Sequence, residues 1–544
     1  MLLSNLDVLA TAPGGVARLR ELILTLAVQG KLVPQDSADE PASELLKKIR
    51  VEKDRLIAAG KIKRDKPLVE IAEDETPFEL PQGWEWARLG AICSYIQRGK
   101  GPVYAENSEH KVISQKCVRW WGLDLTPARF ITPESFAKYE TVRFLQVGDL
   151  LWNSTGTGTI GRACLVPSEQ GKAGLVADSH VTVVRAMQID SSFLWRWIQS
   201  PYVQSEIEGS ASGTTNQIEL NTSTVVNHLI PLPPLAEQSR IVTRVEELMC
   251  LCDALEAKGQ LEAAQHAQLV STLLGQLTAS STPGELHDNW QRVAQHFDLL
   301  LDRPAAVDAL EQTILQLAVR GLLVPQDSTD EPASTLLQKI RLEKDRLIAE
   351  GKIKRDKPLP PIAEDEKPFE LPVGWEWVRL NDLIRIGSGD GLTAAQMAPA
   401  GTIPVYGGNG VNGHHDRANV EEPTLVIGRV GYYCGSIHLT PSRAWVTDNA
   451  FITRYPKAFL DMKWLYWLLV GTNLKENDSA TAQPVISGRK VYPIVVALPP
   501  LSEQSRIVAR VESLRRLCAD LRQRLAARQT TQAHLAEALV NEVA

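Results

Sequence analysis

The sequence predicts an α+β protein in which a helical framework and a mixed α/β centre each occur twice, as an internal duplication. The segment VPQDS at 33–37 returns at 324–328, and KIKRDKPL at 61–68 returns at 352–359, both with an offset of 291 residues. A second block, LPPL-x-EQSRIV, runs from 232 to 242 and returns at 498–508, with an offset of 266 residues. Between the matching blocks the similarity nearly vanishes. A duplication that keeps its frame while its centres diverge predicts one scaffold with two different recognition surfaces, which favours an adaptor over an enzyme.

The first framework segment of each copy predicts a helix followed by a glycine cap and a second helix. Apolar residues at spacings of three and four form one stripe in each copy: Val16, Leu19, Ile23 and Leu26, then Val307, Leu310, Ile314 and Leu317. Gly30 and Gly321 stand where a C-terminal cap is expected. Ser37 or Asp39 is expected to cap the next helix, which continues to about Ala59 in the first copy and Glu350 in the second.

The second framework segment of each copy predicts a long helix with heptad spacing. Its apolar positions match residue for residue between the copies: Ile241, Val245, Leu248, Cys252 and Leu255, then Ile507, Val511, Leu514, Cys518 and Leu521. At ~1.5 Å per residue, about forty residues would span roughly 60 Å, more than one domain needs for packing. These residues therefore indicate a spacer helix. The alternative is an ordinary amphipathic helix that lies on its own domain.

Each centre is entered through the same motif, PFELP-x-GWEW-x-RL, which places two tryptophans at strand-like alternation. Trp84 and Trp86, and again Trp375 and Trp377, are predicted to be packing anchors. Short β-branched runs such as 174–185 and 424–430 follow, with glycine-rich turns and helical stretches. This mixture predicts an α+β domain in each centre.

The first centre contains GTGTIG at 156–161, which matches the dinucleotide fingerprint. The context argues against a nucleotide site, because Arg162 leads into another β-like run and Pro167 rather than into a helix. Phosphate loops, HExxH and GxSxG motifs and the Asn-Pro-Pro-aromatic motif of amino-methyltransferases are absent from the sequence. We therefore expect a non-catalytic chain that binds no cofactor. An enzyme built on GTGTIG is the most distant alternative.

Composition bounds the location and the chemistry of the chain. Its 544 residues are enough for several domains. No run of about 18 apolar residues occurs, and the N-terminus lacks the pattern of a signal peptide, so we expect a cytoplasmic protein with no membrane partner. The seven cysteines are scattered without CxxC spacing, which predicts buried free thiols and no metal site.

The charge is unevenly distributed between framework and centres. The net charge of -7 opposes a polyanionic partner, because nucleic-acid binding depends on Lys and Arg. From Ala87 to Pro231, however, 13 Lys and Arg face 12 Asp and Glu, and from Val378 to Ala497, 11 face 9. The acidic surplus therefore belongs to the framework, and a basic face on either centre is compatible with the sequence.

The centres are rich in amide, hydroxyl and cationic side chains interleaved with glycine. Asn and Gln pair with adenine and Arg with guanine in the major groove, and hydroxyl and cationic groups hold phosphates. Each residue alone is more often a turn former or a surface polar group, but together they suit the reading of DNA bases. The candidate DNA-binding residues are Lys100, Lys116, Arg119, Asn153, Ser154, Thr155, Thr157, Arg162, Asn216 and Gln217 in the first centre, and Asn409, His414, His415, Arg417, Arg429, Asn449, Gln483 and Arg489 in the second.

These motifs together resemble the specificity subunits of type I restriction-modification systems. The resemblance rests on GWEW-x-RL opening each variable region, LPPL-x-EQSRIV closing it into a long helix, and the repetition of this arrangement. Within the centres it rests on GDLLWNSTGTGTIGR (148–162) and TTNQIELN (214–221), and on IPVYGGNGVNG (403–413), IGRVG (427–431) and WVTDNAF (445–451). The match covers essentially the full chain.

The resemblance implies a fold, a function and partners. Each centre would be a target recognition domain, and the two long helices would form an antiparallel two-helix coiled coil with pseudo-two-fold symmetry that separates the half-sites of a bipartite, asymmetric DNA target. Two modification (methyltransferase) subunits carrying S-adenosylmethionine would dock on the framework. Two restriction (endonuclease/translocase) subunits using ATP and Mg would join them.

The implied domains are a helical arm (1–75), the first target recognition domain (76–236), a central region with the long helix, a linker and the second arm (237–366), the second target recognition domain (367–502) and the C-terminal spacer helix (503–544). Two alternatives remain. One is a DNA-targeting adaptor of another methyltransferase-based phage-defence system, and the other is a duplicated protein-interaction scaffold, which the acidic net charge favours.

Overall fold

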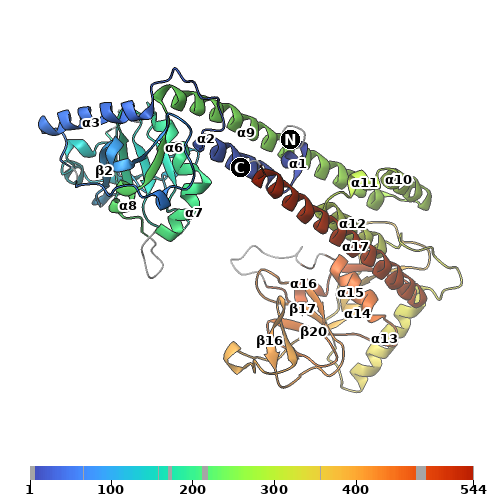
Figure 1. Cartoon of the computed structure of the whole chain (residues 1–544). Helices are drawn as coiled ribbons and strands as arrows, with labels where there is room; N and C mark the ends of the chain where they lie inside the picture. Colours follow the sequence, from blue (N-terminus) through green and yellow to red (C-terminus); the bar gives the residue numbers. More distant parts are fainter. Residues whose placement is uncertain are drawn as a thin grey trace. The chain divides into compact units, whose positions relative to one another are not determined.

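The computed structural model forms two compact units, of which the first combines two segments that are distant in the sequence (Figure 1). Unit 1 contains residues 1–261 and 529–544, and unit 2 contains residues 262–528. The structure describes residues 6–64, 66–156, 158–169, 174–210, 219–355, 357–472, 474 and 485–542. Helix α9 (Leu235–Ala279) and helix α17 (Leu501–Asn541) each contribute one part to unit 1 and the other part to unit 2.

The N-terminal part of unit 1 folds into the predicted pair of helices. Helix α2 (Gly15–Val28) buries the stripe that includes Leu19 and Ile23, and α3 (Ala42–Ala58) follows the VPQDS loop. Gly30 has a φ of 71°, which confirms the predicted left-handed cap. A Cβ at Gly30 would lie 2.5 Å from Cγ of Pro81, so this position also needs glycine for space. The remaining helices of unit 1 are α1 (Leu6–Thr11), α4 (Leu89–Ile92), α5 (Pro133–Phe136), α6 (Ser191–Gln199), α7 (Pro201–Ser210) and α8 (Thr222–Asn227).

The prediction that Ser37 or Asp39 caps α3 is wrong. The helix begins at Ala42, whose backbone N–H donates to the carbonyl of Gly83 in the GWEW motif at 2.8 Å. The Asp39 carboxylate instead accepts a 2.6 Å hydrogen bond from Nη2 of Arg240 on α9. Tertiary contacts therefore replace the local cap, and they tie the arm to both ends of the centre.

Unit 2 repeats this framework. Helix α12 (Pro304–Val319) corresponds to α2, and α13 (Ala333–Ala349) corresponds to α3. Ala333 N–H donates to Gly374 O at 2.8 Å, and Arg506 Nη2 donates to Asp330 at 2.6 Å. The other helices are α10 (Pro283–Gln295), α11 (Phe297–Leu300), α14 (Leu380–Leu383), α15 (Met462–Gly471) and α16 (Gly488–Val491).

The two centres share one sheet topology despite their unlike sequences. In unit 1 the central sheet has the strand order β2-β11-β8-β9, and in unit 2 it has the order β14-β20-β17-β18, with the same antiparallel pairings. These strands are β2 (Cys93–Arg98), β8 (Leu150–Asn153), β9 (Ala163–Leu165), β11 (Val181–Ala186), β14 (Arg385–Ser388), β17 (Leu425–Gly428), β18 (Ile437–Leu439) and β20 (Ala450–Arg454). The central sheet is thus part of the duplication.

The entry and exit motifs of each centre pair with each other. Strand β1 (Glu85–Arg88) lies antiparallel to β12 (Leu229–Leu232), and β13 (Glu376–Arg379) lies antiparallel to β21 (Val495–Leu498) in the equivalent register. The second sheet of each centre differs, with the order β10-β4-β7-β3 in unit 1 and β16-β15-β19 in unit 2. Its strands are β3 (Tyr104–Ala105), β4 (Lys111–Ile113), β7 (Arg129–Ile131), β10 (Val176–Ala177), β15 (Ile403–Gly407), β16 (Gly410–His415) and β19 (Trp445–Val446), and unit 1 adds the hairpin of β5 (Val118–Arg119) and β6 (Gly122–Leu123).

A buried polar cluster joins each arm, centre and long helix. Trp84 Nε1 donates to Oε2 of Glu237 at the start of α9 at 3.0 Å, and Gln35 Nε2 donates to Oε1 of the same carboxylate at 3.2 Å. Glu237 is only 1% exposed, and this burial raises the pKa of its carboxyl group. The hydrogen bonds from Gln35 and Trp84 oppose that shift. In unit 2 the same roles are filled by Trp375, Gln326 and Glu503.

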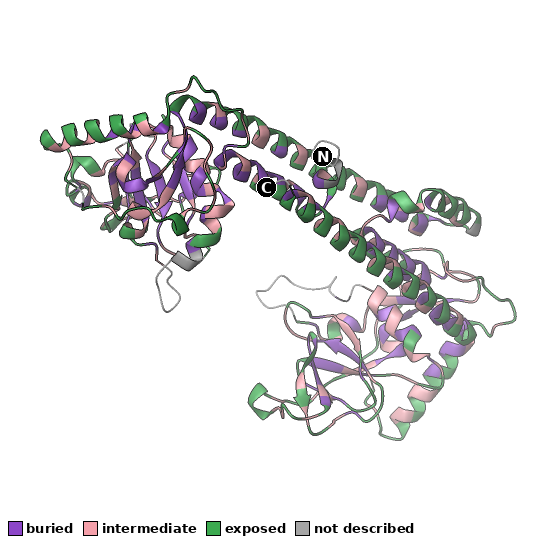
Figure 2. Ribbon diagram, in the orientation of Figure 1, coloured by how far each residue is buried: buried purple, intermediate pink, exposed green. Residues whose placement is uncertain are grey.

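The long helices bury the face that carries the predicted heptad positions (Figure 2). In unit 1, Ile241, Val245 and Cys252 of α9 share a hydrophobic cluster with α2 and with Ala536 and Val540 of α17. In unit 2, α17 and the second half of α9 share a cluster with α12, which includes Cys518, Leu525, Val270 and Leu274. Ile507 and Val511 are buried against the second centre, and Leu248, Leu255, Leu514 and Leu521 are half-buried. Helices α2 and α12 are therefore part of the packing that holds the long helices.

Among the residues that the structure describes, no helix is long and apolar enough to cross a membrane, and no cluster of His, Cys, Asp and Glu could hold a metal ion. No disulfide joins the described cysteines. They are buried as predicted, except for Cys250, which lies exposed on α9.

Removal of the Trp84 donor should destabilise unit 1. The substitution W84F keeps an aromatic ring but leaves a buried carboxylate with one donor fewer, so we expect a loss of about 1–3 kcal/mol. Urea unfolding of the full chain, followed by circular dichroism, measures this loss. W375F should have a similar effect on unit 2. W86F is the control, and an equal loss in W86F would show that ring packing, not the hydrogen bond, is responsible.

His228 should make unit 1 sensitive to mild acid. Its Nε2 accepts from Trp197 Nε1 at 3.2 Å and its ring lies 5.3 Å from that of Trp152, and burial lowers the pKa of His228 to about 4. A group with a depressed pKa contributes stability above its unfolded pKa of about 6.5, and that stability is lost as the pH falls toward 4.

Between pH 7 and pH 5 we therefore expect His228 to cost the chain at most about 2 kcal/mol of unfolding free energy. H228Q keeps an acceptor for Trp197 without the titration, so it should lose less stability over this pH range in urea unfolding. Ile494 stands at the equivalent position of unit 2, which therefore lacks this group. Parallel pH profiles of the wild-type chain and H228Q would contradict the assignment.

Candidate nucleic-acid interface

The central sheet of each centre ends in a hairpin whose loop is the most divergent part of the shared topology. In unit 1 the loop between β8 and β9 spans 154–162 and contains GTGTIG, and in unit 2 the loop between β17 and β18 spans 429–436 and reads RVGYYCGS. Gly156 and Gly161 in the first loop, and Gly431 and Gly435 in the second, have φ between 81° and 98°. Both loops therefore depend on left-handed glycine turns, which explains the GTGTIG motif without a nucleotide.

Two of the predicted DNA-binding residues form the base of the first loop. Asn153 and Ser154 are fully buried. The Asn153 side-chain amide donates to the carbonyl of Gln115 at 3.1 Å, and the Ser154 hydroxyl bonds to that of Thr182. These side chains hold the loop and the strand exits together.

Polar and cationic side chains surround this base. Thr155 Oγ1 lies 2.8 Å from Nδ1 of His180 and 3.3 Å from Oε1 of Gln115. Lys116, next to Gln115, is exposed, and Arg162 is half-buried, with Nη2 donating to Gly158 O at 3.1 Å. The strand exits thus bring amide, hydroxyl, imidazole and ammonium groups to one rim.

The same rim carries a buried acid and an ion pair. Asp178 is 2% exposed, and burial raises its pKa, although the backbone N–H of His180 donates to its Oδ1 at 2.8 Å. Arg98 pairs with Glu219 and donates from Nε to Ser179 O at 3.0 Å. Lys100 is exposed, and its backbone N–H donates to Ala177 O, so it lies on this side of the sheet.

The second loop collects a different set of side chains. Arg429 Nη1 donates to Asp448 O at 3.2 Å, and the Arg429 backbone N–H donates to Asn449 O at 2.9 Å. A Cβ at Gly408 would lie 2.7 Å from Val430 O, so the β15–β16 turn that carries Asn409 lies against this loop. Asn409 and Asn449 are both exposed.

Two exposed tyrosines at the tip of the second loop were not among the predicted residues. Tyr432 is 81% exposed and Tyr433 is 50% exposed, with ring centroids 5.1 Å apart. The signal that could have revealed them is an aromatic pair between glycines, at the position equivalent to GTGTIG. His180 and Gln115 were also missed, because neither lies in a motif that repeats.

The remaining predicted residues lie on other segments or outside the described residues. Arg119 lies on β5, 3.8 Å from Asp124, and His415 lies toward the end of β16, with its ring 5.3 Å from that of Trp445. His414 and Arg417 are exposed beside His415, and Arg489 is exposed at the start of α16, three residues after Ile486 binds Arg429 O. Thr157, Asn216, Gln217 and Gln483 fall outside the residues that the structure describes.

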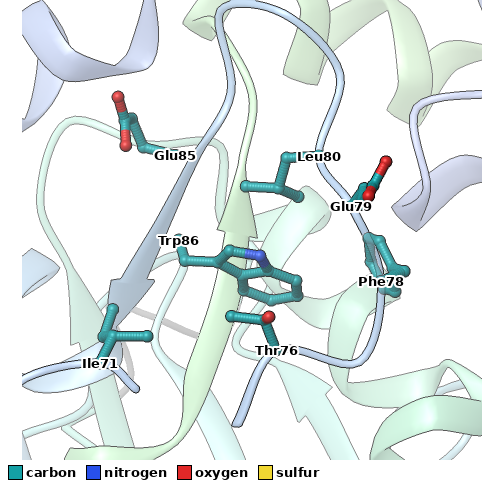
Figure 3. Close-up of a pocket in the computed structure, with 7 residues that line it drawn as sticks. All are labelled: Ile71, Thr76, Phe78, Glu79, Leu80, Glu85 and Trp86. Atoms are coloured by element: carbon teal, nitrogen blue, oxygen red, sulfur yellow. The ribbon is translucent and has the colours of Figure 1, made fainter. Parts of the chain in front are cut away.

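The framework of unit 1 has a separate hollow of about 600 Å³ with a different character (Figure 3). The Trp86 ring stands between Leu80 and Thr76 and faces Phe78, whose centroid is 5.1 Å away, while Glu85 points to the other side. The lining carries Glu79 and Glu85 and no Lys or Arg. A polyanion would be repelled here, so the loops are the better candidates for DNA.

Comparisons with known proteins agree with this division into two similar parts. The family model described as the type I restriction modification DNA specificity domain matches residues 81–265 and again 372–528, more than half of the chain. The specificity subunit of the type I restriction enzyme EcoEI from Escherichia coli is 36% identical over 559 residues, covering 97% of this chain and 93% of that protein. The EcoAI specificity subunit from Escherichia coli is 35% identical over 581 residues, with the same coverage. A chain from a solved type I R-M system has a TM-score of 0.48 and 20% identity, covering 86% of this chain and 99% of that chain.

Proposed function

The chain belongs to the family of type I restriction-modification DNA specificity proteins, and from this we propose that it recognises a bipartite, asymmetric double-stranded DNA target in the cytoplasm. The observation that carries the proposal is the pair of hairpin loops. They occupy the same place in the same sheet topology, yet the first carries Thr155 beside His180 and Lys116 of neighbouring segments, and the second carries two tyrosines beside Asn409 and Asn449 of neighbouring segments. Two different DNA half-sites require two recognition loops that are placed equivalently but carry different side chains.

The two rims support different contacts. Asn409 and Asn449 can donate and accept toward an adenine edge in the major groove. Tyr432 and Tyr433 offer flat surfaces that can stack on a base or wedge between base steps. Lys100 and Lys116 suit the phosphate backbone, which positions the protein without reading sequence.

We propose the domain division given by the sequence, with target recognition domains at 76–236 and 367–502 between framework segments at 1–75, 237–366 and 503–544. The long helices α9 and α17 would act as a spacer, and its length would set the distance between half-sites, as subunit geometry does for dimeric DNA readers.

We propose that this chain recognises the DNA sequence and that partner subunits catalyse the reactions. Two modification subunits with S-adenosylmethionine and two restriction subunits with ATP and Mg would assemble on the framework. Duplicated exposed positions support a paired partner. Leu235 is 45% exposed beside a hollow lined by Leu45 and Lys48 of α3, and its equivalent, Leu501, is 40% exposed.

Each loop should control one half of the target. In the complex with its modification subunits, N409A/N449A should relax base preference in one half-site, and K116A/H180A should weaken binding at the other. Selection from a random DNA pool, followed by sequencing, measures both halves. Each lost base contact should cost about 1–3 kcal/mol of discrimination.

The DNA affinity of the K116A/H180A complex should also fall less steeply with salt. The slope of log K against log salt concentration should be shallower by about 1. N409A/N449A is its matched control, because it removes no phosphate-binding cation. If either variant altered both half-sites, the modular model would fail. If binding to DNA did not depend on salt, a protein-interaction scaffold would be the better explanation.

The two framework copies should bind one modification subunit each. L235E and L501E place a charge at the equivalent exposed position of each copy, so each should reduce the stoichiometry from two modification subunits to one. The double variant should bind none. Native mass spectrometry of the co-expressed subunits measures this, and V51E at an exposed site on α3 is a surface control. An unchanged stoichiometry in all variants would move the docking surface elsewhere.

A further inference from the structure

The two framework copies are nearly interchangeable, which creates a pairing problem. The contacts that fix the arm to the long helix are the same in both: Trp84, Gln35 and Asp39 with Glu237 and Arg240, and Trp375, Gln326 and Asp330 with Glu503 and Arg506. The apolar stripes also match position for position. These contacts alone would allow α2 to pack on the first half of α17 in place of α12, or α12 on the first half of the α9 of a second molecule.

One equivalent pair of positions breaks this identity. In unit 1, Arg20 of α2 binds Glu256 of α9 at 2.8 Å and Asp253 at 2.6 Å. In unit 2, the position of Arg20 is taken by Glu311 of α12, and the position of Glu256 is taken by Arg522 of α17. Their side chains also meet at 2.8 Å, so the ion pair is preserved with its charges exchanged.

Neighbouring ion pairs in unit 2 show the same exchange of acidic and basic residues between the short and the long helix. Arg522 also binds Asp308 at 2.7 Å, and Arg515 binds Glu311 at 2.5 Å. The positions equivalent to Asp308 and Arg515 are uncharged in the first copy, where they are Ala17 and Met249. The short helix is thus basic at this point in unit 1 and acidic in unit 2, and the long helix has the opposite sign in each.

We propose that this inverted charge set is a pairing code by which each short helix accepts the first half of the long helix of its own copy and rejects the first half of that of the other copy, in the same chain or in a second molecule of it. In a cross-paired state Arg20 would face Arg522 and Arg515, and Glu311 would face Glu256 and Asp253. Both interfaces would then bring like charges together, while the buried polar clusters would be satisfied in either pairing. The charges therefore supply the difference in free energy that specificity requires.

The location of the pairs fits a specificity role better than a stability role. Arg20 and Arg522 are about one-third exposed, and ion pairs of that kind add little stability. A change of sign, however, converts an attraction into a repulsion in each of two interfaces at once. Charged positions beside an apolar seam select partners in helical assemblies in this way.

The test is a set of four full-length chains. R20E/D253A/E256R gives the first copy the charges of the second at these three positions, and D308A/E311R/R515M/A519D/R522E gives the second copy the code of the first. The third chain carries both sets, so the codes are exchanged but still differ, and the fourth is the wild type. Each chain is refolded from urea over a range of concentrations, and the fraction of dimer is measured by size exclusion with light scattering.

The pairing code predicts that each single recoding raises the dimer fraction by about three- to tenfold over the wild type, because a cross-paired, domain-swapped dimer is no longer penalised. The chain with both sets should return to the wild-type value. If the ion pairs serve only local stability, the single and combined recodings will show the same dimer fraction, which would overturn the proposal. The two single recodings are independent, so a folding failure in one leaves the other as a test.

Discussion

The structure depends on a buried carboxylate at the start of each long helix. Glu237 and Glu503 are each 1% exposed, and a buried charge is tolerated only with hydrogen-bond partners. The partners come from different segments: an indole N–H from the entrance of the centre and an amide from the arm. The next residue, Gln238, accepts the backbone N–H of Asp190 at the start of α6 at 2.8 Å, which adds the centre itself. One short motif, EQSR, therefore fixes arm, centre and spacer helix.

Because the frame is fixed at this point, the centres are free to differ. The central sheet keeps its strand order in both copies, but the second sheet and the loop after β8 or β17 do not. The left-handed glycines give each loop its turn, and Tyr432 and Tyr433 between them are exposed, whereas Cys434 is buried in the core. The hairpin of unit 2 carries the Tyr432–Tyr433 pair, whereas in the hairpin of unit 1 Thr155 lies against His180 of a neighbouring segment. Variation of recognition without loss of stability follows from this separation.

The sequence predicted the framework well because its contacts are periodic or repeated. The apolar stripe of α2, the Gly30 cap and the heptad positions of α9 are local signals, and the structure places each in a buried or capped position. Asp39 was misjudged because its partner, Arg240, is 201 residues away. The loop residues were only partly anticipated. Asn153 and Ser154 have suitable side chains for DNA, but burial depends on Gln115 and Thr182, which no local pattern connects to them.

The charge distribution shows how an acidic chain can still be suited to DNA. The framework hollow beside Trp86 carries Glu79 and Glu85, whereas the first loop is flanked by exposed Lys100 and Lys116. Glu219 pairs with Arg98 and the carboxylate of Asp178 is buried, while Lys100 and Lys116 are exposed cations at that rim. A duplex near the chain would be repelled by the acidic framework and attracted to the loop. In the proposed function, net charge would restrict where DNA binds more than whether it binds, since the acidic surplus would orient the duplex toward the two loops.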